Sequence, residues 1–167
     1  MKITSFLILL FVFYSCQNIG SFSNLSSPSL KNKTEISYSF QDASVPPEYH
    51  RSYSIILSEN NYRFVVDSYG EIIKDTMIFL SNQRKKIRQT LRAFKKGQIK
   101  NVKRSQKNNG CSGGNGEEIK IIKEGQVYFK GSNYYCGGQT EGNLSGDTKL
   151  FLNELKKQID VNVFKYD

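Results

Sequence analysis

Alternating apolar and polar residues predict three strands in succession. Tyr53, Ile55 and Leu57 occupy every second position, as on the buried face of a strand, and the alternation returns in YRFVVDS and IIKDTMIFL. Short polar segments at residues 59–61 and 69–71 separate these runs and suit tight turns. This part of the chain is therefore expected to form an antiparallel meander.

Two later segments switch to the 3.6-residue period of an amphipathic helix. The first follows an N-cap at Ser81 or Asn82 and ends at Gly97, which suits a C-terminal cap. Its apolar stripe comprises Ile87, Thr90, Leu91 and Phe94. The second begins after Asp147, whose carboxylate can cap a helix. Its apolar stripe comprises Phe151, Leu152, Leu155 and Ile159.

Between the two helical segments, EEIKIIK and QVYFK flank Glu124 and Gly125 and predict a β-hairpin. The resulting element order is β-β-β-α-β-β-α. Such an order favours a fold in which the helices segregate to one face of an antiparallel sheet. We therefore predict an α+β domain, with a small antiparallel sheet and two helices on one face.

The segment before the strands has the composition of a tether. Residues 16–47 are rich in Ser and Asn and end in two prolines, so they bury too little apolar surface to offset their ordering entropy. The alternating Ile36, Tyr38 and Phe40 leave an alternative, an early edge strand. The expected domains are a signal peptide at 1–15, the tether at 16–47 and a single folded domain at 48–167.

The chain opens with an export signal. Lys2 precedes an apolar run at residues 6–14, which is shorter than the roughly 20 residues that span a bilayer. The run leads into Cys16, and FYSC resembles a bacterial lipobox, with a small residue before the cysteine that is diacylated and becomes N-terminal. Leu/Phe-rich runs ending in SC look like lipoprotein signals of the Bacteroidota in particular. Phe13 and Tyr14 depart from the usual lipobox pattern, and an ordinary secreted protein or an uncleaved anchor are the alternatives.

The residues after Cys16 bear on which membrane carries the protein. In some bacteria an Asp directly after the lipidated cysteine favours inner-membrane retention, and Gln17 stands here instead. Acid-rich stretches just beyond the cysteine are surface-export signals in Bacteroidota lipoproteins, whereas this chain has no acid between Cys16 and Glu35. The resemblance therefore implies a cell-envelope protein, lipid-anchored in the outer membrane, whose domain faces the periplasm.

Three cysteines leave one unpaired in an exported chain unless one of them has another role. If Cys16 carries lipid, Cys111 and Cys136 remain to form a disulfide in an oxidising compartment. The midpoint of this pair falls at the turn of the predicted hairpin, so the two cysteines are expected opposite one another at its open end. Closing a loop of about 25 residues would stabilise the fold by roughly 3.5 kcal/mol. A redox pair or metal ligands fit less well, since neither cysteine has a C-x-x-C motif or a neighbouring histidine.

Glycines cluster beside both of these cysteines, in CSGGNGE and CGGQTEGNLSGD. Neither stretch matches the phosphate-binding motifs G-x-x-x-x-G-K-[ST] or G-x-G-x-x-G. Such glycines suit tight turns around the disulfide. A small ligand groove at this end of the domain is the alternative, because loops on a rigid scaffold often bind ligands.

The formal net charge of +9 is concentrated in one stretch of the chain. Eleven Lys or Arg residues lie from Arg84 to Lys107, and no acid occurs between Asp75 and Glu117. The predicted anion-binding residues are Arg84, Lys85, Arg88, Arg92, Lys95, Lys96, Lys100, Lys103, Arg104 and Lys107. Such a patch attracts anionic polymers or lipid headgroups, although a solvated basic helix face is the plainer alternative. The export signal argues against nucleic acid as the partner.

Candidate catalytic residues are few. His50 is the only histidine, no G-x-S-x-G or H-E-x-x-H motif occurs, and Glu117 and Glu118 should face opposite ways on a strand. We therefore predict no enzyme activity, no metal and no cofactor. The favoured function is a non-enzymatic, lipid-anchored envelope protein that binds a membrane surface, an anionic envelope polymer such as peptidoglycan, or a partner protein. The alternative is an inhibitor or accessory domain that acts on another exported enzyme through its hairpin and glycine-rich loops.

Overall fold

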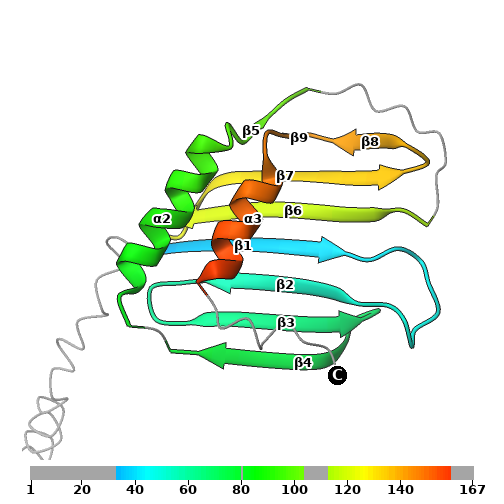
Figure 1. The fold of residues 1–167 in the computed structure, drawn as a ribbon, viewed down its shortest axis with the longest axis horizontal. Coiled ribbons are helices and arrows are strands. Elements are labelled where there is room, and N and C mark those ends of the chain that lie inside the picture. The colour runs from blue at the N-terminus through cyan, green and yellow to red at the C-terminus, as the bar shows by residue number, and fades with distance from the viewer. Residues whose placement is uncertain (1–32, 80, 104–112, 159–167) are drawn as a thin grey trace, which may run out of the picture.

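The computed structural model describes residues 33–79, 81–103 and 113–158. The strands are β1 (Thr34–Gln41), β2 (Ser52–Leu57), β3 (Tyr62–Ser68), β4 (Glu71–Ile78), β5 (Lys100–Asn101), β6 (Asn115–Lys123), β7 (Gln126–Cys136), β8 (Gln139–Gly142) and β9 (Leu144–Ser145). The helices are α2 (Gln83–Lys96) and α3 (Thr148–Lys157) (Figure 1). Most residues in these elements belong to strands.

One large antiparallel sheet dominates the fold. Its seven strands follow the order β4-β3-β2-β1-β6-β7-β8, and β5 pairs with β9 in a second sheet of two strands. The predicted α+β domain with the order β-β-β-α-β-β-α is therefore wrong, because the structure is mainly antiparallel sheet with two helices and has a different strand order. The prediction missed β1, β5, β8 and β9. Three of these have only two to four residues, too few for an alternation to be recognised.

The strand β1 lies at the centre of the sheet, between β2 and β6. Ile36 and Tyr38 are buried, with exposed fractions of 0% and 4%. Ser37 and Ser39, on the other face, are only partly exposed. The structure thus differs both from the predicted tether, which covered this segment, and from the alternative edge strand. The serines that made the segment resemble a tether belong to the polar face of a central strand.

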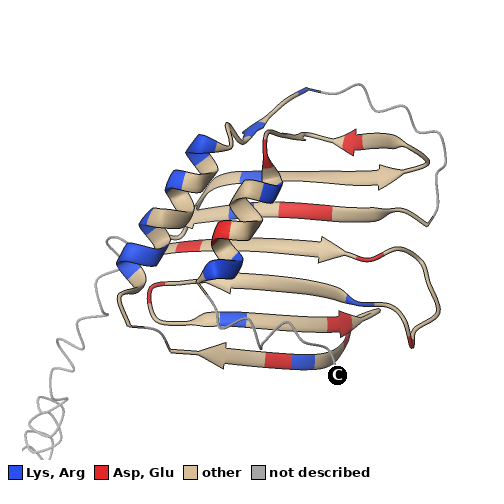
Figure 2. Cartoon of the chain, viewed as in Figure 1, with Lys and Arg blue, Asp and Glu red and all other residues tan. Residues whose placement is uncertain are grey.

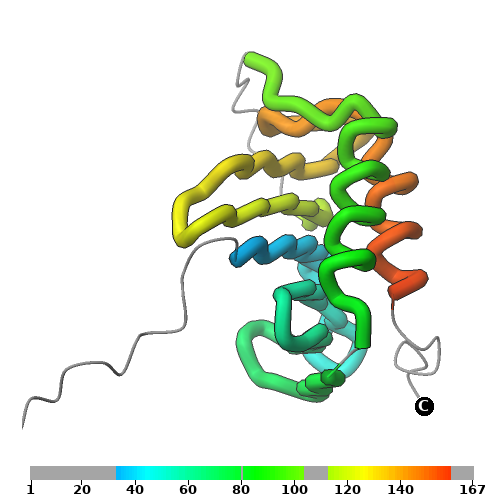
Figure 3. Tube along the Cα trace, turned by 90° about the vertical axis from the view of Figure 1, so that its left-hand side faces the viewer, coloured from blue at the N-terminus to red at the C-terminus, as the bar shows by residue number. Residues whose placement is uncertain are grey.

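Both helices lie on one face of the sheet and enclose the core against it (Figures 1 and 3). Phe151 and Leu155 of α3 are fully buried in this core. The ring of Phe94 in α2 meets that of Phe151 edge-on, with centroids 6.1 Å apart, and so joins the two helices. Asp147 caps α3 as predicted, since its Oδ1 accepts a hydrogen bond from the backbone N–H of Leu150 at 2.9 Å.

The hairpin of β6 and β7 forms as predicted, with Lys123 paired to Gln126 across the turn. Asn115 pairs with Tyr135 in this ladder, and a Cβ on Gly114 would lie 2.8 Å from the Cβ of Cys136, so Gly114 lies level with Cys136. Cys136 is disulfide-bonded, and Cys111 lies outside the described residues. The pairing of Cys111 with Cys136 stays a prediction.

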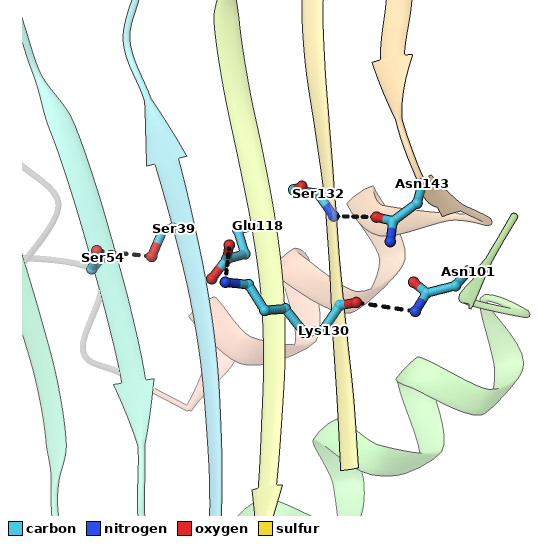
Figure 4. A network of polar contacts seen from close by, with 7 residues as sticks. All are labelled: Ser39, Ser54, Asn101, Glu118, Lys130, Ser132 and Asn143. Carbon is cyan, nitrogen blue, oxygen red and sulfur yellow. Dashed lines mark hydrogen bonds and ion pairs between the residues drawn. The ribbon is translucent and has the colours of Figure 1, made fainter. Parts of the chain in front are cut away.

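The face of the sheet turned away from the helices, here called the open face, carries polar side chains over β1, β2, β6 and β7 (Figure 4). The hydroxyls of Ser39 and Ser54 lie 3.0 Å apart across β1 and β2. Lys130 of β7 forms an ion pair with Glu118 of β6 at 3.4 Å. In the described part of the chain, both helices lie on the opposite face, so these side chains project from the sheet without a helix over them (Figures 3 and 4).

Candidate functional site

The predicted basic residues of the helix lie together on the outer side of α2 (Figure 2). Six side chains are exposed, and they define what is called here the basic surface: Arg84, Lys85, Arg88, Arg92, Lys95 and Lys96. The 14 residues of α2 span about 21 Å. The helical period separates these cations from the buried Ile87, Thr90 and Ala93. The six cations therefore lie away from the buried stripe of the helix.

No acid balances the charge of the basic surface within α2, whose sequence is QRKKIRQTLRAFKK. The ion pairs among the described residues join Arg63 to Asp75, Lys130 to Glu118, and Lys157 to Glu154. None of these pairs uses a residue of the basic surface. The six cations therefore present their charge to solvent, and to any anionic partner, with little local neutralisation.

The remaining predicted cations are only partly placed by the structure. Lys100 and Lys103 are exposed beyond the C-terminal end of α2, and Lys100 lies in β5, opposite Ser145 of β9. Arg104 and Lys107 lie outside the described residues, as does the lipidation site predicted at Cys16. Lys100 and Lys103 thus extend the positive charge from the helix to the small second sheet.

His50, the sole histidine, is held in place by hydrogen bonds to neighbouring residues. It is buried, its Nδ1 accepts a hydrogen bond from the backbone N–H of Tyr69 at 3.3 Å, and its Nε2 lies 3.4 Å from Oγ of Ser52. An acceptor Nδ1 puts the proton of the neutral ring on Nε2. A general base needs an unprotonated nitrogen toward the serine, so this tautomer does not activate Ser52 as a nucleophile.

Glu117 forms a buried polar network that the sequence did not reveal. Its Oε2 accepts a hydrogen bond from Tyr38 at 3.2 Å, and its Oε1 accepts from Tyr135 and, at 3.3 Å, from Thr148. Thr148 begins α3, where the helix dipole favours a negative charge. Glu118 lies on the open face, so the expected divergence of the two neighbouring carboxylates is confirmed (Figure 4). The network joins β1, β6, β7 and α3.

Two buried tyrosines should respond in opposite ways to loss of the hydroxyl. Burial raises the pKa of both Tyr62 and Tyr38, so both stay protonated, and the Tyr62 hydroxyl has no partner among the described residues. Tyr62→Phe should raise the free energy of unfolding by about 1 kcal/mol by removing an unsatisfied buried group. Tyr38→Phe, the matched control, should lower it by about 1 kcal/mol, because Glu117 loses a donor. Urea unfolding measures both; equal losses would contradict this assignment.

Comparisons with known proteins add no relative. No family model, no curated protein and no solved structure matches the chain. Over residues 33–79, 81–103 and 113–158, no helix is long and apolar enough to cross a membrane. Over the same ranges, no group of three or more His, Cys, Asp and Glu side chains is placed to hold a metal ion.

Proposed function

We propose that this protein is a non-enzymatic, lipid-anchored envelope protein that rests its domain on an anionic membrane surface through the basic surface of α2. The observation that carries the proposal is the set of exposed cations along one helix with no acid among them. Each cation near an anionic bilayer contributes about 1 kcal/mol. The six together supply on the order of 6 kcal/mol, enough to hold a domain whose anchor is already in the membrane.

The path of the chain supports contact between the basic surface and the membrane that carries the anchor. Thr34 begins β1 at the end of the sheet that α2 crosses (Figure 1). The segment from the predicted lipidation site at Cys16 to this strand can reach at most about 60 Å when fully extended. An anchor at Cys16 would therefore leave the basic surface free to reach the same bilayer.

A lipid surface fits better than a purely polar polymer because an exposed aromatic residue lies near the start of α2. Phe79 is 76% exposed and precedes the helix by only four residues. Aromatic side chains favour the interfacial region of a bilayer. We propose the outer membrane, with the domain facing the periplasm, as the location where anionic headgroups would meet the helix.

Neutralising the basic surface should abolish most binding to anionic vesicles. In the lipid-free chain of residues 17–167, we expect replacement of Arg84, Arg88, Arg92 and Lys95 by Gln to weaken binding at least about 100-fold. Vesicles of phosphatidylglycerol and phosphatidylcholine, sedimented at low and at high salt, measure this. The matched control removes the same charge from β6, β7 and the residue before β1, at Lys33, Lys120, Lys123 and Lys130.

Two outcomes would contradict the proposal. Equal weakening by both variants would mean that net charge alone drives binding, without a defined surface. Salt-sensitive retention on peptidoglycan sacculi, with no binding to vesicles, would replace the lipid with an anionic polymer as the partner of the basic surface.

A second candidate function is favoured by the end of the β6–β7 hairpin. Val127 and Tyr128 are 58% and 60% exposed there, and Lys123 lies over the Tyr128 ring with its Nζ 3.5 Å from the centroid. An ordered apolar tip of this kind suits insertion into another exported protein, as an inhibitor or accessory domain requires. A single stoichiometric partner, captured from envelope extract and lost on Tyr128→Ser, would support this function.

A further inference from the structure

A hollow of about 1000 Å³ lies on the side of the domain that the proposed membrane contact does not use. It crosses the end of the sheet where β1 finishes, and its lining includes Ser39, Ser54, Glu118 and Ser132, which project from the open face (Figure 4). Loop residues, among them Tyr69, complete its rim. The hollow and the basic surface are therefore on opposite sides of the sheet.

Gly116 provides part of the floor of the hollow. Its partners in the ladder are Gln41 of β1 and Tyr134 of β7, so a position without a side chain separates two large polar ones. A Cβ at Gly116 would lie 3.4 Å from the nearest atoms, the backbone oxygen of Asn133 and Oε1 of Gln41. The backbone thus tolerates a side chain here, but that side chain would occupy the space of the hollow.

The chemistry of the lining selects against anions. Among the described residues, no Lys or Arg lines the hollow. Hydroxyls, two side-chain amides and carboxylates supply most of the polar groups, and within the described chain no hydrogen bond involves the side chain of Gln41 or Glu141. The hydroxyl of Tyr134 accepts from the backbone N–H of Gly114 at 2.9 Å, which leaves its own proton free to donate.

Most carboxylates of the lining already accept hydrogen bonds or form an ion pair, which leaves few of their oxygens to coordinate a cationic ligand. Asp42 accepts hydrogen bonds from the backbone N–H groups of Ala43 and Arg51. Asp67 accepts from the backbone N–H of Gly70, and Glu118 is paired with a lysine. A ligand rich in uncharged groups that both donate and accept hydrogen bonds matches this lining best.

Tyr69 adds a rigid aromatic platform at the rim. One face of its ring stacks on His50, with centroids 4.0 Å apart, and its hydroxyl donates to the backbone oxygen of Val45 at 2.6 Å. The residue is nevertheless 55% exposed, so the ring is fixed in place while much of its surface faces solvent. Aromatic rings held in this way offer an apolar surface to ligands whose remaining groups are polar.

We propose that the hollow binds a neutral oligosaccharide. Its hydroxyls would bond to the serines, Gln41, Glu141 and Tyr134, and the C–H face of a sugar ring would lie on Tyr69. This site does not depend on the basic surface, because the two lie on opposite sides of the sheet. A domain resting on a membrane through α2 would turn the hollow toward glycans on the other side.

An array of neutral, anionic and cationic glycans, probed with the chain of residues 17–167, tests the proposal. We expect binding to at least one neutral glycan, weakened at least 10-fold by Gly116→Val, which fills the floor with a strand-compatible side chain. Gln41→Ala should weaken the same binding without altering the strand. The matched control is Ser37→Val, on the same face of β1 but outside the lining of the hollow.

Comparing the basic-surface variant with the two variants of the hollow shows which of the two surfaces binds the glycan. Neutralisation of the basic surface should leave neutral-glycan binding unchanged, so failure of the membrane proposal and failure of this one are distinguishable. Circular dichroism must show that Gly116→Val is folded; otherwise Gln41→Ala alone is decisive. The proposal is overturned if no neutral glycan binds, if only charged glycans bind, or if binding survives both substitutions in the hollow.

Discussion

A chain that begins at residue 33 should fold, whereas a chain that begins at residue 48, the boundary expected from composition, should not. The difference between them contains β1, the central strand of the sheet. Without it, β2 and β6 lose their shared neighbour and the sheet divides into two parts. Ile36 and Tyr38 are also lost from the core, at roughly 1.5–3 kcal/mol for each buried side chain. Together with the unpaired backbone groups, this loss approaches the 5–15 kcal/mol that stabilises a typical domain.

Circular dichroism and proton NMR of the two chains show directly which of them folds. The chain of residues 33–167 should unfold cooperatively in urea, and that of residues 48–167 should lack dispersed amide resonances. Adding a peptide of residues 33–47 in trans should restore structure to the shorter chain, because β1 makes its contacts through one continuous segment. A cooperative unfolding transition in the chain of residues 48–167 alone would show that β1 is dispensable.

The position of β1 also shows where sequence patterns stop being informative. Alternation predicted β2, β3 and β4 because their apolar residues recur over six to eight positions between clear turns. The same alternation exists at Ile36 and Tyr38, but Ser and Asn dominate the neighbouring residues. Composition then outweighed periodicity. The strand joins the sheet through partners far away in the chain, such as Ile119 and Ile121, which no local pattern reveals.

The candidate sites differ in the same way, according to whether local sequence or long-range strand pairing brings their residues together. The basic surface could be predicted because one helix carries all of it, and the helical period alone separates its cations from the apolar stripe. The hollow could not, because its residues come from several strands whose register is set by long-range pairing. Glu117 was likewise hidden: its three hydroxyl donors come from β1, β7 and α3. A site carried by one helix or strand can be predicted from local sequence, whereas a site built across several strands of a sheet cannot.

Replacing Cys16 by Ala should abolish incorporation of palmitate. The remaining membrane association should then be electrostatic and should be lost at high salt. In a bacterium that processes lipoproteins, the wild-type protein should stay in the membrane fraction through a wash at 1 M salt. Acyl chains contribute about 0.8 kcal/mol for each buried CH₂ group, a term that salt does not screen. The contact of the basic surface is screened, since the Debye length falls from about 8 Å at physiological salt to about 3 Å at 1 M.

Three variants separate the two contributions. The Cys16→Ala protein should remain partly bound at low salt and be released at 1 M salt, whereas the protein with a neutralised basic surface should stay bound at both. Combining the changes should release the protein at any salt concentration, because neither the acyl chain nor the polybasic surface then remains to hold it. If the Cys16→Ala protein resists 1 M salt and keeps its first residues, the apolar run at residues 6–14 is itself the anchor and the lipobox assignment is wrong.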